Sequence, residues 1–219
     1  MSMGQGYFIS FEGLDGAGKT TQMELLAGWL QRQGMEYIRT CEPGGTPLGV
    51  EIRRLLFQQP ELTITPLAEA FLFQADRAQH FQTRILPALA EGKVVLSDRC
   101  FDSSIAYQGA AQGLGTDLIT QLSRIATQGH APDLTIFLDL DPALVHKRTS
   151  ALDSGRQEQS RFDRASEQFH TRLRQAFLAL AQAEPQRIKV IDATQSVERI
   201  HQHIVELIRP RLNQSQGAI

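Results

Sequence analysis

Five short apolar runs recur along the chain and predict β-strands. Most of them are almost continuous in apolar residues, which is typical of strands that are covered on both faces. We therefore predict buried strands at YFISF (7–11), YIRTC (37–41), VVLSD (94–98), LTIFLDL (134–140) and IKVID (188–192).

Longer stretches with helical spacing of their apolar residues separate these runs. We expect helices over residues 20–34, 66–86, 166–185 and 196–208, with Gly34 as the stop of the first and Pro87 ending or kinking the second. Strands that alternate with helices indicate a parallel sheet with helices on both faces. Such sheets bind ligands beyond the carboxyl ends of their strands.

The stretch FEGLDGAGKTTQ (11–22) lies between the first predicted strand and the first predicted helix. It fits the phosphate-binding pattern G-x-x-x-x-G-K-[ST], in which backbone N–H groups and the helix N-terminus surround a phosphate. The lysine reaches the outer phosphates and the hydroxyl ligates Mg²⁺. The alternative is a glycine-rich turn with a solvated lysine. We predict an ATP-binding loop made by Gly13, Leu14, Asp15, Gly16, Ala17, Gly18, Lys19, Thr20 and Thr21.

Nucleotide binding alone does not distinguish a switch, a motor, a kinase or a passive binder. A GTPase would also carry a D-x-x-G switch after the phosphate loop and an N-K-x-D motif, and the sequence has neither. A small-molecule kinase needs a second site beside the triphosphate and cations that stabilise charge during transfer.

Composition narrows the class further. The 219 residues favour one domain, although two small ones are possible. The net charge of −2 suggests no general affinity for nucleic acid or membrane surfaces. The two cysteines, Cys41 and Cys100, match no metal site or disulfide framework, and the first residues do not resemble a secretory signal. We therefore expect a reduced, cytoplasmic protein.

Three further segments make the second site specific. EPGGTPLG (42–49), FLFQADRAQH (71–80) and DRCFDSSIAYQG (98–109), together with the phosphate loop, resemble the thymidylate kinase family, and the resemblance extends to residues 190–200. It implies a P-loop NTPase fold of the α/β class: a five-stranded parallel sheet with helices on both faces and a short lid. Residues 1–219 would form a single kinase domain with the lid at about 150–163. The implied reaction is ATP + dTMP = ADP + dTDP in dTTP synthesis, catalysed by a homodimer with Mg²⁺.

The acceptor phosphate explains why arginines are needed. It is mostly dianionic near neutral pH, because its second pKa is about 6, so the difficulty is to bring two polyanions together. Arg77 and Arg99 are candidates, and Arg53 is a weaker one. By resemblance, Arg99 holds the acceptor phosphate, Arg77 contacts thymine and Asp98 joins Thr20 as a Mg²⁺ ligand. The alternative for Asp98 and Arg99 is a local ion pair at the surface.

The resemblance also assigns the rest of the acceptor pocket. Asp15 binds the sugar 3′-OH, Phe71 stacks on thymine, Tyr107 lies against the sugar, and one of Ser103 and Ser104 contacts the base. Phe71 could instead belong to an apolar core, and Asp15 could be a solvated turn residue. Cys100 departs from the family, which usually has tyrosine there, so we expect a local change in packing. The predicted substrate-binding set is completed by Glu42, Pro43 and Gln108.

The resemblance in the lid segment implies roles for the remaining cationic side chains. Some thymidylate kinases carry an arginine inside the phosphate loop, where this chain has Gly16, and members without it supply one from the lid. We assign Arg156 to the transition state and Arg161 to its support, with Arg148 beside adenine. A solvated polar loop is the alternative. The predicted catalytic set is Lys19, Asp15, Arg99, Arg156 and Arg161.

Two other functions stay open. A deoxynucleoside kinase shares the loop and the D-R pair, but it needs a carboxylate base near Glu12 or Glu42 for a neutral hydroxyl. A non-catalytic nucleotide-binding module is the second, although it would not need this set of cations.

Overall fold

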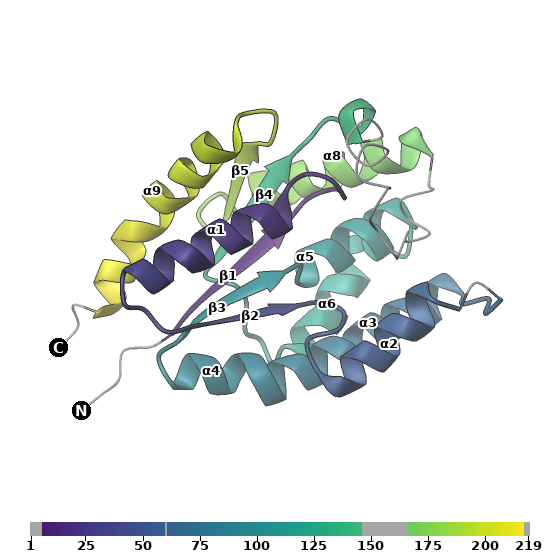
Figure 1. Cartoon of the computed structure of the whole chain (residues 1–219). Coiled ribbons are helices and arrows are strands. Elements are labelled where there is room, and N and C mark those ends of the chain that lie inside the picture. The colour runs from purple at the N-terminus through teal and green to yellow at the C-terminus, as the bar shows by residue number, and fades with distance from the viewer. Residues whose placement is uncertain (1–5, 60, 146–165, 217–219) are drawn as a thin grey trace.

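The five apolar runs form one sheet in the computed structural model, which describes residues 6–59, 61–145 and 166–216. The strands are β1 (Tyr7–Glu12), β2 (Tyr37–Cys41), β3 (Val94–Asp98), β4 (Leu134–Asp139) and β5 (Ile188–Asp192). All four strand pairs are parallel and the order is β2-β3-β1-β4-β5 (Figure 1). The prediction of a five-stranded parallel sheet is confirmed.

Helices connect the strands and pack on both faces of the sheet. Within the described residues, no helix combines the length and apolarity needed to cross a bilayer. The helices are α1 (Lys19–Arg32), α2 (Pro47–Phe57), α3 (Pro66–His80), α4 (Leu86–Ala90), α5 (Phe101–Ser104), α6 (Thr116–Ala126), α8 (Glu167–Ala183) and α9 (Val197–Gln216), with π-helical segments η1 (Phe81–Ile85) and η2 (Ile105–Ala111).

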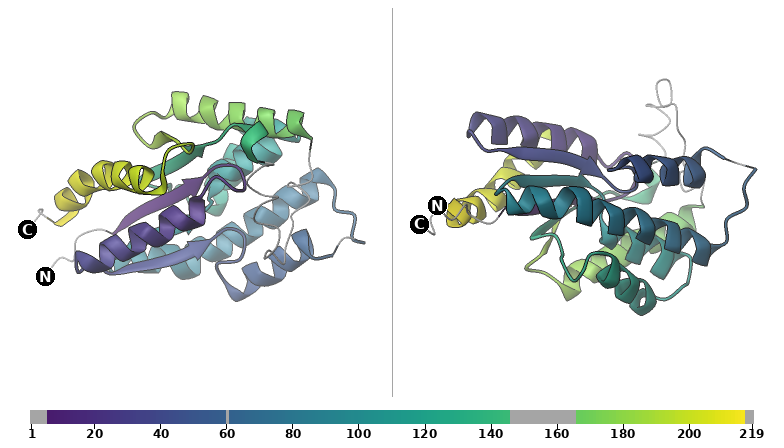
Figure 2. Two further views of the ribbon diagram at one scale, coloured as in Figure 1. Left: turned by 45° about the horizontal axis from the view of Figure 1, so that its top comes forward. Right: turned by 90° about the horizontal axis from the view of Figure 1, so that it is seen from below.

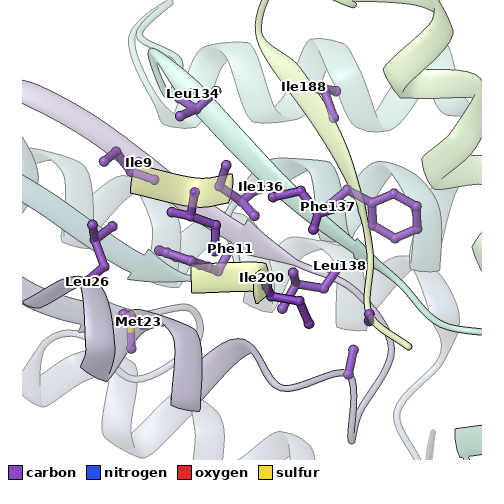
Figure 3. Close-up of a cluster of buried hydrophobic side chains, with 14 of the residues drawn as sticks. Ile9, Phe11, Met23, Leu26, Leu134, Ile136, Phe137, Leu138, Ile188 and Ile200 are labelled. Atoms are coloured by element: carbon purple, nitrogen blue, oxygen red, sulfur yellow. The ribbon is translucent and has the colours of Figure 1, made fainter. Parts of the chain in front are cut away.

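Alternate side chains of the strands fill two apolar layers. Ile9 and Phe11 of β1 belong to the cluster that includes α1 and α9, which contact each other on one face of the sheet (Figures 1 and 3). Phe8 points the other way, and its ring lies 5.8 Å from that of Phe81 (Figure 2 shows α4 and α8 on this opposite face). Near-continuous apolar strands therefore serve two buried faces, as the sequence pattern predicts.

Proline positions account for two differences from the predicted helices. Pro87 does not end the helical stretch, which passes through η1 and continues to Ala90. Pro87 falls in the first turn of α4, directly after the wider π-helical segment η1, and a missing N–H is tolerated there. Helix α9 likewise continues through Pro210 to Gln216, beyond the predicted end at residue 208.

Three helical segments were not expected from spacing alone. They are α2, α6 and the α5–η2 stretch. Helix α2 has a clear start, because the Thr46 hydroxyl accepts a hydrogen bond from the Gly49 N–H at 3.0 Å and Pro47 occupies the first turn. Helix α2 and the α5–η2 stretch contribute side chains to the walls of the candidate site.

Candidate active site

The candidate site lies beyond the carboxyl ends of β1, β2 and β3. These strands are neighbours, and Asp98 at the end of β3 is aligned with Phe11 of β1 and Cys41 of β2. The segments that follow them, 13–18, 42–46 and 99–100, therefore emerge side by side. The order of the strands thus brings together three motifs that are far apart in the sequence.

The phosphate loop has the backbone that its glycines predict. Gly13 has φ +141°, and a Cβ there would lie 2.7 Å from the Leu138 carbonyl oxygen. Gly18 has φ +97° at the start of α1, so the helix N-terminus faces the loop. Lys19 Nζ donates to the carbonyl oxygens of Gly13 and Leu14, both at 3.1 Å. A cation and a helix N-terminus therefore converge on one loop.

The other residues of the loop divide by exposure. Leu14 and Ala17 bury their side chains in the core, so only their backbone can serve a ligand. Thr21 is exposed on the first turn of α1.

The environment of Lys19 also changes its pKa. Burial lowers this pKa, and the positive charge of Arg99 lowers it further.

Thr20 and Asp98 lie together, as the sequence predicts for a Mg²⁺ site. The Thr20 hydroxyl donates to Asp98 Oδ2 at 3.4 Å, and the buried Asp98 Oδ1 has no hydrogen-bond partner. In the described part of the chain, no group of three His, Cys, Asp or Glu residues could hold a metal ion. Two oxygen ligands nonetheless suit Mg²⁺, which keeps several waters and takes few ligands from the protein.

Arg99 links the loop to the neighbouring pocket. The backbone of Arg99 has φ +69°, a conformation that is uncommon for residues other than glycine. Nη2 donates to Asp15 Oδ1 at 2.8 Å and Nη1 donates to Ser103 Oγ at 3.0 Å. The guanidinium also lies 5.3 Å from the centre of the Tyr107 ring. Arg99 is therefore paired with Asp15 across the site, which argues against the simple Asp98–Arg99 surface pair.

Glu12 holds the turn that carries Arg99. Its side chain is fully buried, and it accepts hydrogen bonds from the Cys100 N–H at 2.7 Å and the Ser103 hydroxyl at 2.5 Å. Burial and the nearby charge of Asp102 raise the pKa of Glu12 to about 8. This carboxyl group thus fastens the Arg99 turn to the end of β1.

A pocket opens beside the phosphate loop and collects most of the predicted substrate-binding residues. It also includes Phe57, Phe73 and Cys100, which the sequence reasoning did not place there. Its lining consists of Asp15, Glu42, Pro43, Arg53, Phe57, Phe73, Arg77, Arg99, Cys100, Ser103, Ser104, Tyr107 and Gln108.

The predicted position of Phe71 in this pocket is wrong. Its side chain is 53% exposed and does not line the pocket, whereas Phe73 does. Residues four apart share a helix face, so Phe73 lies on the same side of α3 as Arg77, and Phe71 does not. The Phe73 ring also packs edge-on against Phe57 at 6.4 Å. The spacing to Arg77 was the signal that could have identified Phe73.

Arg77 is fixed by a buried polar network at the base of the pocket. Nε donates to Glu42 Oε2 at 2.9 Å, Nη1 to Gln74 Oε1 at 2.9 Å and Nη2 to Ser104 Oγ at 3.0 Å. Only 1% of Arg77 is exposed. Burial alone would raise the pKa of Glu42, but Arg77 and His80 hold it below its ordinary value. The pocket therefore presents a guanidinium whose plane is held on three sides.

Three other polar residues of α3 belong to the site but were not predicted from the sequence. Glu69 accepts a hydrogen bond from Gln108 Nε2 at 2.7 Å, and Asp76 accepts one from the Gly44 N–H at 3.1 Å. His80 contacts Glu42. Glu69 and Phe73 precede Arg77 by eight and four residues, so a helical repeat could have indicated Glu69.

Cys100 packs in an apolar cluster with Phe8, Phe81 and Val95. Its side chain is fully buried, and burial raises the pKa of its thiol well above the usual value. The cysteine side chain therefore belongs to the apolar packing of this chain, and the expected difference from the family's packing stays a prediction. The predicted lid and its Arg148, Arg156 and Arg161 lie outside the described residues.

Comparison with known proteins agrees with the site. The sequence model of the thymidylate kinase family matches residues 11–204. A thymidylate kinase of Symbiobacterium thermophilum is 44% identical over 213 residues, covering 96% of this chain and 97% of the relative. One from Bifidobacterium longum is 49% identical over 198 residues, with 89% and 93% covered. The crystal structure of thymidylate kinase from Ehrlichia chaffeensis matches with a TM-score of 0.75 and 34% identity, covering 94% of this chain and 99% of that one. The chain belongs to the thymidylate kinase family.

Proposed function

We propose that the protein transfers the γ-phosphoryl group of ATP to dTMP, forming ADP and dTDP for dTTP synthesis. The observation that carries this proposal is the junction at Arg99. Its guanidinium contacts Asp15 of the phosphate loop and lines the second pocket. One cation therefore serves both the donor loop and the acceptor pocket.

The chemistry needs charge neutralisation more than it needs a base. The dianionic acceptor phosphate attacks directly and in line, without a covalent enzyme intermediate. Arg99 holds that phosphate, and Lys19 interacts with the outer phosphates of ATP. Asp15 accepts a hydrogen bond from the sugar 3′-OH and so fixes the distance between the acceptor nucleotide and the phosphate loop. Thr20 and Asp98 would hold Mg²⁺, which supplies neutralisation of the phosphate charge.

The walls of the pocket match a thymine nucleotide. Phe73, in place of Phe71, stacks on the base, while Arg77, Ser104 and Gln108 face its polar edge. Tyr107 packs against the sugar. Ser103 orients Arg99, and Glu42, Pro43 and Arg53 complete the wall.

The lid arginines complete the proposed catalytic set. Arg156 contacts the transferring phosphoryl group, Arg161 supports it and Arg148 lies against adenine. Arg156→Ala should therefore lower turnover about 100-fold or more, the order found when one stabilising donor is removed. Near-full turnover of this variant would remove Arg156 from the mechanism.

The structure argues against a deoxynucleoside kinase. Both oxygens of Glu42 are engaged, by Arg77 and His80, and both oxygens of Glu12 are engaged, by Cys100 and Ser103. Each of the two carboxyl groups that could activate a neutral hydroxyl is thus hydrogen-bonded to other residues of the site. A passive binding module would have no use for Arg99 at the junction.

The acceptor decides between these functions. ADP release is measured with Mg·ATP and dTMP, dUMP, thymidine, dAMP or no acceptor, with Lys19→Ala as the inactive control. We expect strong dependence on dTMP. Turnover with thymidine but not dTMP would indicate a nucleoside kinase, and ATP binding without turnover on any acceptor would contradict the assignment of the pocket.

We also propose a cytoplasmic homodimer that binds only these small molecules. Helices α3 and α6 contact each other and expose Leu67, Phe71, Leu118 and Ile125, of which Ile125 is 75% exposed. Apolar side chains at such exposure fit burial against a second copy. Sedimentation of a Phe71→Ser, Ile125→Ser double variant should give a monomer, and an unchanged mass would exclude this face from the interface.

A further inference from the structure

His80, the last residue of α3, is fully buried between two segments of the site. Its Nδ1 lies 3.1 Å from Glu42 Oε1, and its Nε2 lies 2.6 Å from Thr40 Oγ1. Because a carboxylate can only accept hydrogen bonds, Nδ1 must carry the proton and donate it to Glu42. His80 therefore fixes one oxygen of this carboxylate.

The other oxygen of Glu42 determines the position of Arg77. Arg77 Nε donates to Glu42 Oε2 at 2.9 Å, and the pair is only 1–2% exposed. The four groups thus form a chain from Thr40 through His80 and Glu42 to the guanidinium that lines the pocket. A carboxylate held at both oxygens cannot turn away from Arg77.

The His80 ring also packs closely against the loop after β2. A Cβ at Gly45 would lie 2.4 Å from His80 Nε2, so only glycine leaves room for the ring. This packing holds the imidazole in one orientation. No described hydrogen bond joins His80 to the phosphate loop.

We propose that His80 is a positioning residue that orients Glu42, and through it Arg77, for the base of the acceptor nucleotide. The proposal rests on the proposed function and adds a residue that touches neither substrate. Its consequence is selective: loss of the Nδ1–H donor weakens the acceptor site and leaves the ATP site unchanged.

Three substitutions of His80 separate this role from simple packing. Asparagine places its amide nitrogen near the position of Nδ1 and can still donate to Glu42. Glutamine places its amide near the position of Nε2, and leucine has no donor. We expect His80→Leu and His80→Gln to raise the KM for dTMP about 10-fold and His80→Asn to raise it less than threefold. The KM for ATP should stay within twofold in all three.

A double substitution tests the path through Glu42. If His80 acts through this carboxylate, adding His80→Leu to Glu42→Gln should change the KM for dTMP by less than twofold. Thermal midpoints are measured in parallel. If the leucine variant does not fold, the comparison of asparagine with glutamine decides the question.

The proposal is overturned if His80→Asn is as impaired as His80→Gln, or if the KM values for dTMP and ATP rise together. Equal, near-wild-type KM values in all variants would overturn it as well. Wild-type protein assayed in parallel distinguishes failure of the His80 proposal from failure of the proposed function. If the wild-type protein shows no dTMP-dependent ADP release, the proposed function itself is contradicted.

Discussion

The phosphate loop and the acceptor pocket are built on different principles. The loop is one continuous stretch whose chemistry comes from its backbone, with Gly13 and Gly18 at positive φ and Lys19 folded onto loop carbonyl oxygens. The pocket is assembled from side chains of the loop after β2, α2, α3 and the segment after β3. Its cations are held by other buried side chains, as Arg77 is held by Glu42, Gln74 and Ser104.

Because of this difference, the phosphate loop and the acceptor pocket should tolerate different substitutions. A backbone site depends on a few glycines and one cation, so most substitutions nearby leave it intact. A side-chain site depends on a network, so residues that touch no ligand also matter to it. Substitutions in the two halves should therefore produce different kinetic changes.

The largest effect is expected in the loop. Lys19→Ala should lower turnover about 10²–10³-fold, because a cation at the developing negative charge is lost, while affinity for dTMP changes little. Steady-state kinetics and dTMP titration measure the two quantities. Lys93→Ala, before β3 at the opposite end of the strand, is the control and should behave as wild type. A Lys19 variant with near-normal turnover would contradict the loop assignment.

A smaller effect is expected in the pocket, where two phenylalanines of one helix should behave differently. Phe73→Ala should raise the KM for dTMP about 10-fold, since stacking of a base on an aromatic ring contributes roughly 1–3 kcal/mol. Phe71→Ala, whose side chain lies outside the pocket, should leave that KM within twofold. The reverse result would restore the first assignment and contradict the face of α3 seen here.

The smallest effect is a change of stability with pH. Burial and the charge of Glu42 raise the pKa of Asp76 to about 6, against the usual value of 3.8. The folded state then holds a proton that the unfolded chain loses, so wild-type stability falls, relative to Asp76→Asn, as the pH rises toward and through 6. The stability of Asp76→Asn relative to wild type should increase by about 1 kcal/mol between pH 5 and 7.

Urea unfolding at pH 5, 6 and 7 measures this difference. Asp117→Asn, on the exposed surface of α6, provides the matched control and should show no such trend. A difference for Asp76→Asn that stays constant, or falls with pH, would contradict the raised pKa.

The same contrast explains how far sequence reasoning could go. The strands, Lys19 and Thr20 are predictable, because each signal is contained in a few neighbouring residues. Phe73 was also within reach, but only through its spacing from Arg77. The same repeat could place Glu69 on the face of Arg77, but the pairing of the polar support was not predictable: His80 contacts Glu42 across 38 positions and Glu69 contacts Gln108 across 39. Such pairs depend on how α3 packs against the site, which no local pattern encodes.

Two predicted helix boundaries also differ from those in the structure. Pro87 and Pro210 look like helix ends by local rules, yet both lie inside helical stretches. At Pro87 the π-helical segment η1 changes the hydrogen-bonding pattern just before the proline. A proline therefore does not by itself mark the end of a helix.

Equilibrium titration of dTMP and of ATP, each alone, into Lys19→Ala and Phe73→Ala tests the central claim most directly. The claim is that a backbone loop binds the donor and a separate side-chain pocket binds the acceptor. We predict that Lys19→Ala weakens ATP binding and leaves dTMP binding within a few-fold of wild type, and that Phe73→Ala does the opposite. Loss of both affinities in the same proportion in either variant would contradict the division of the site into two halves.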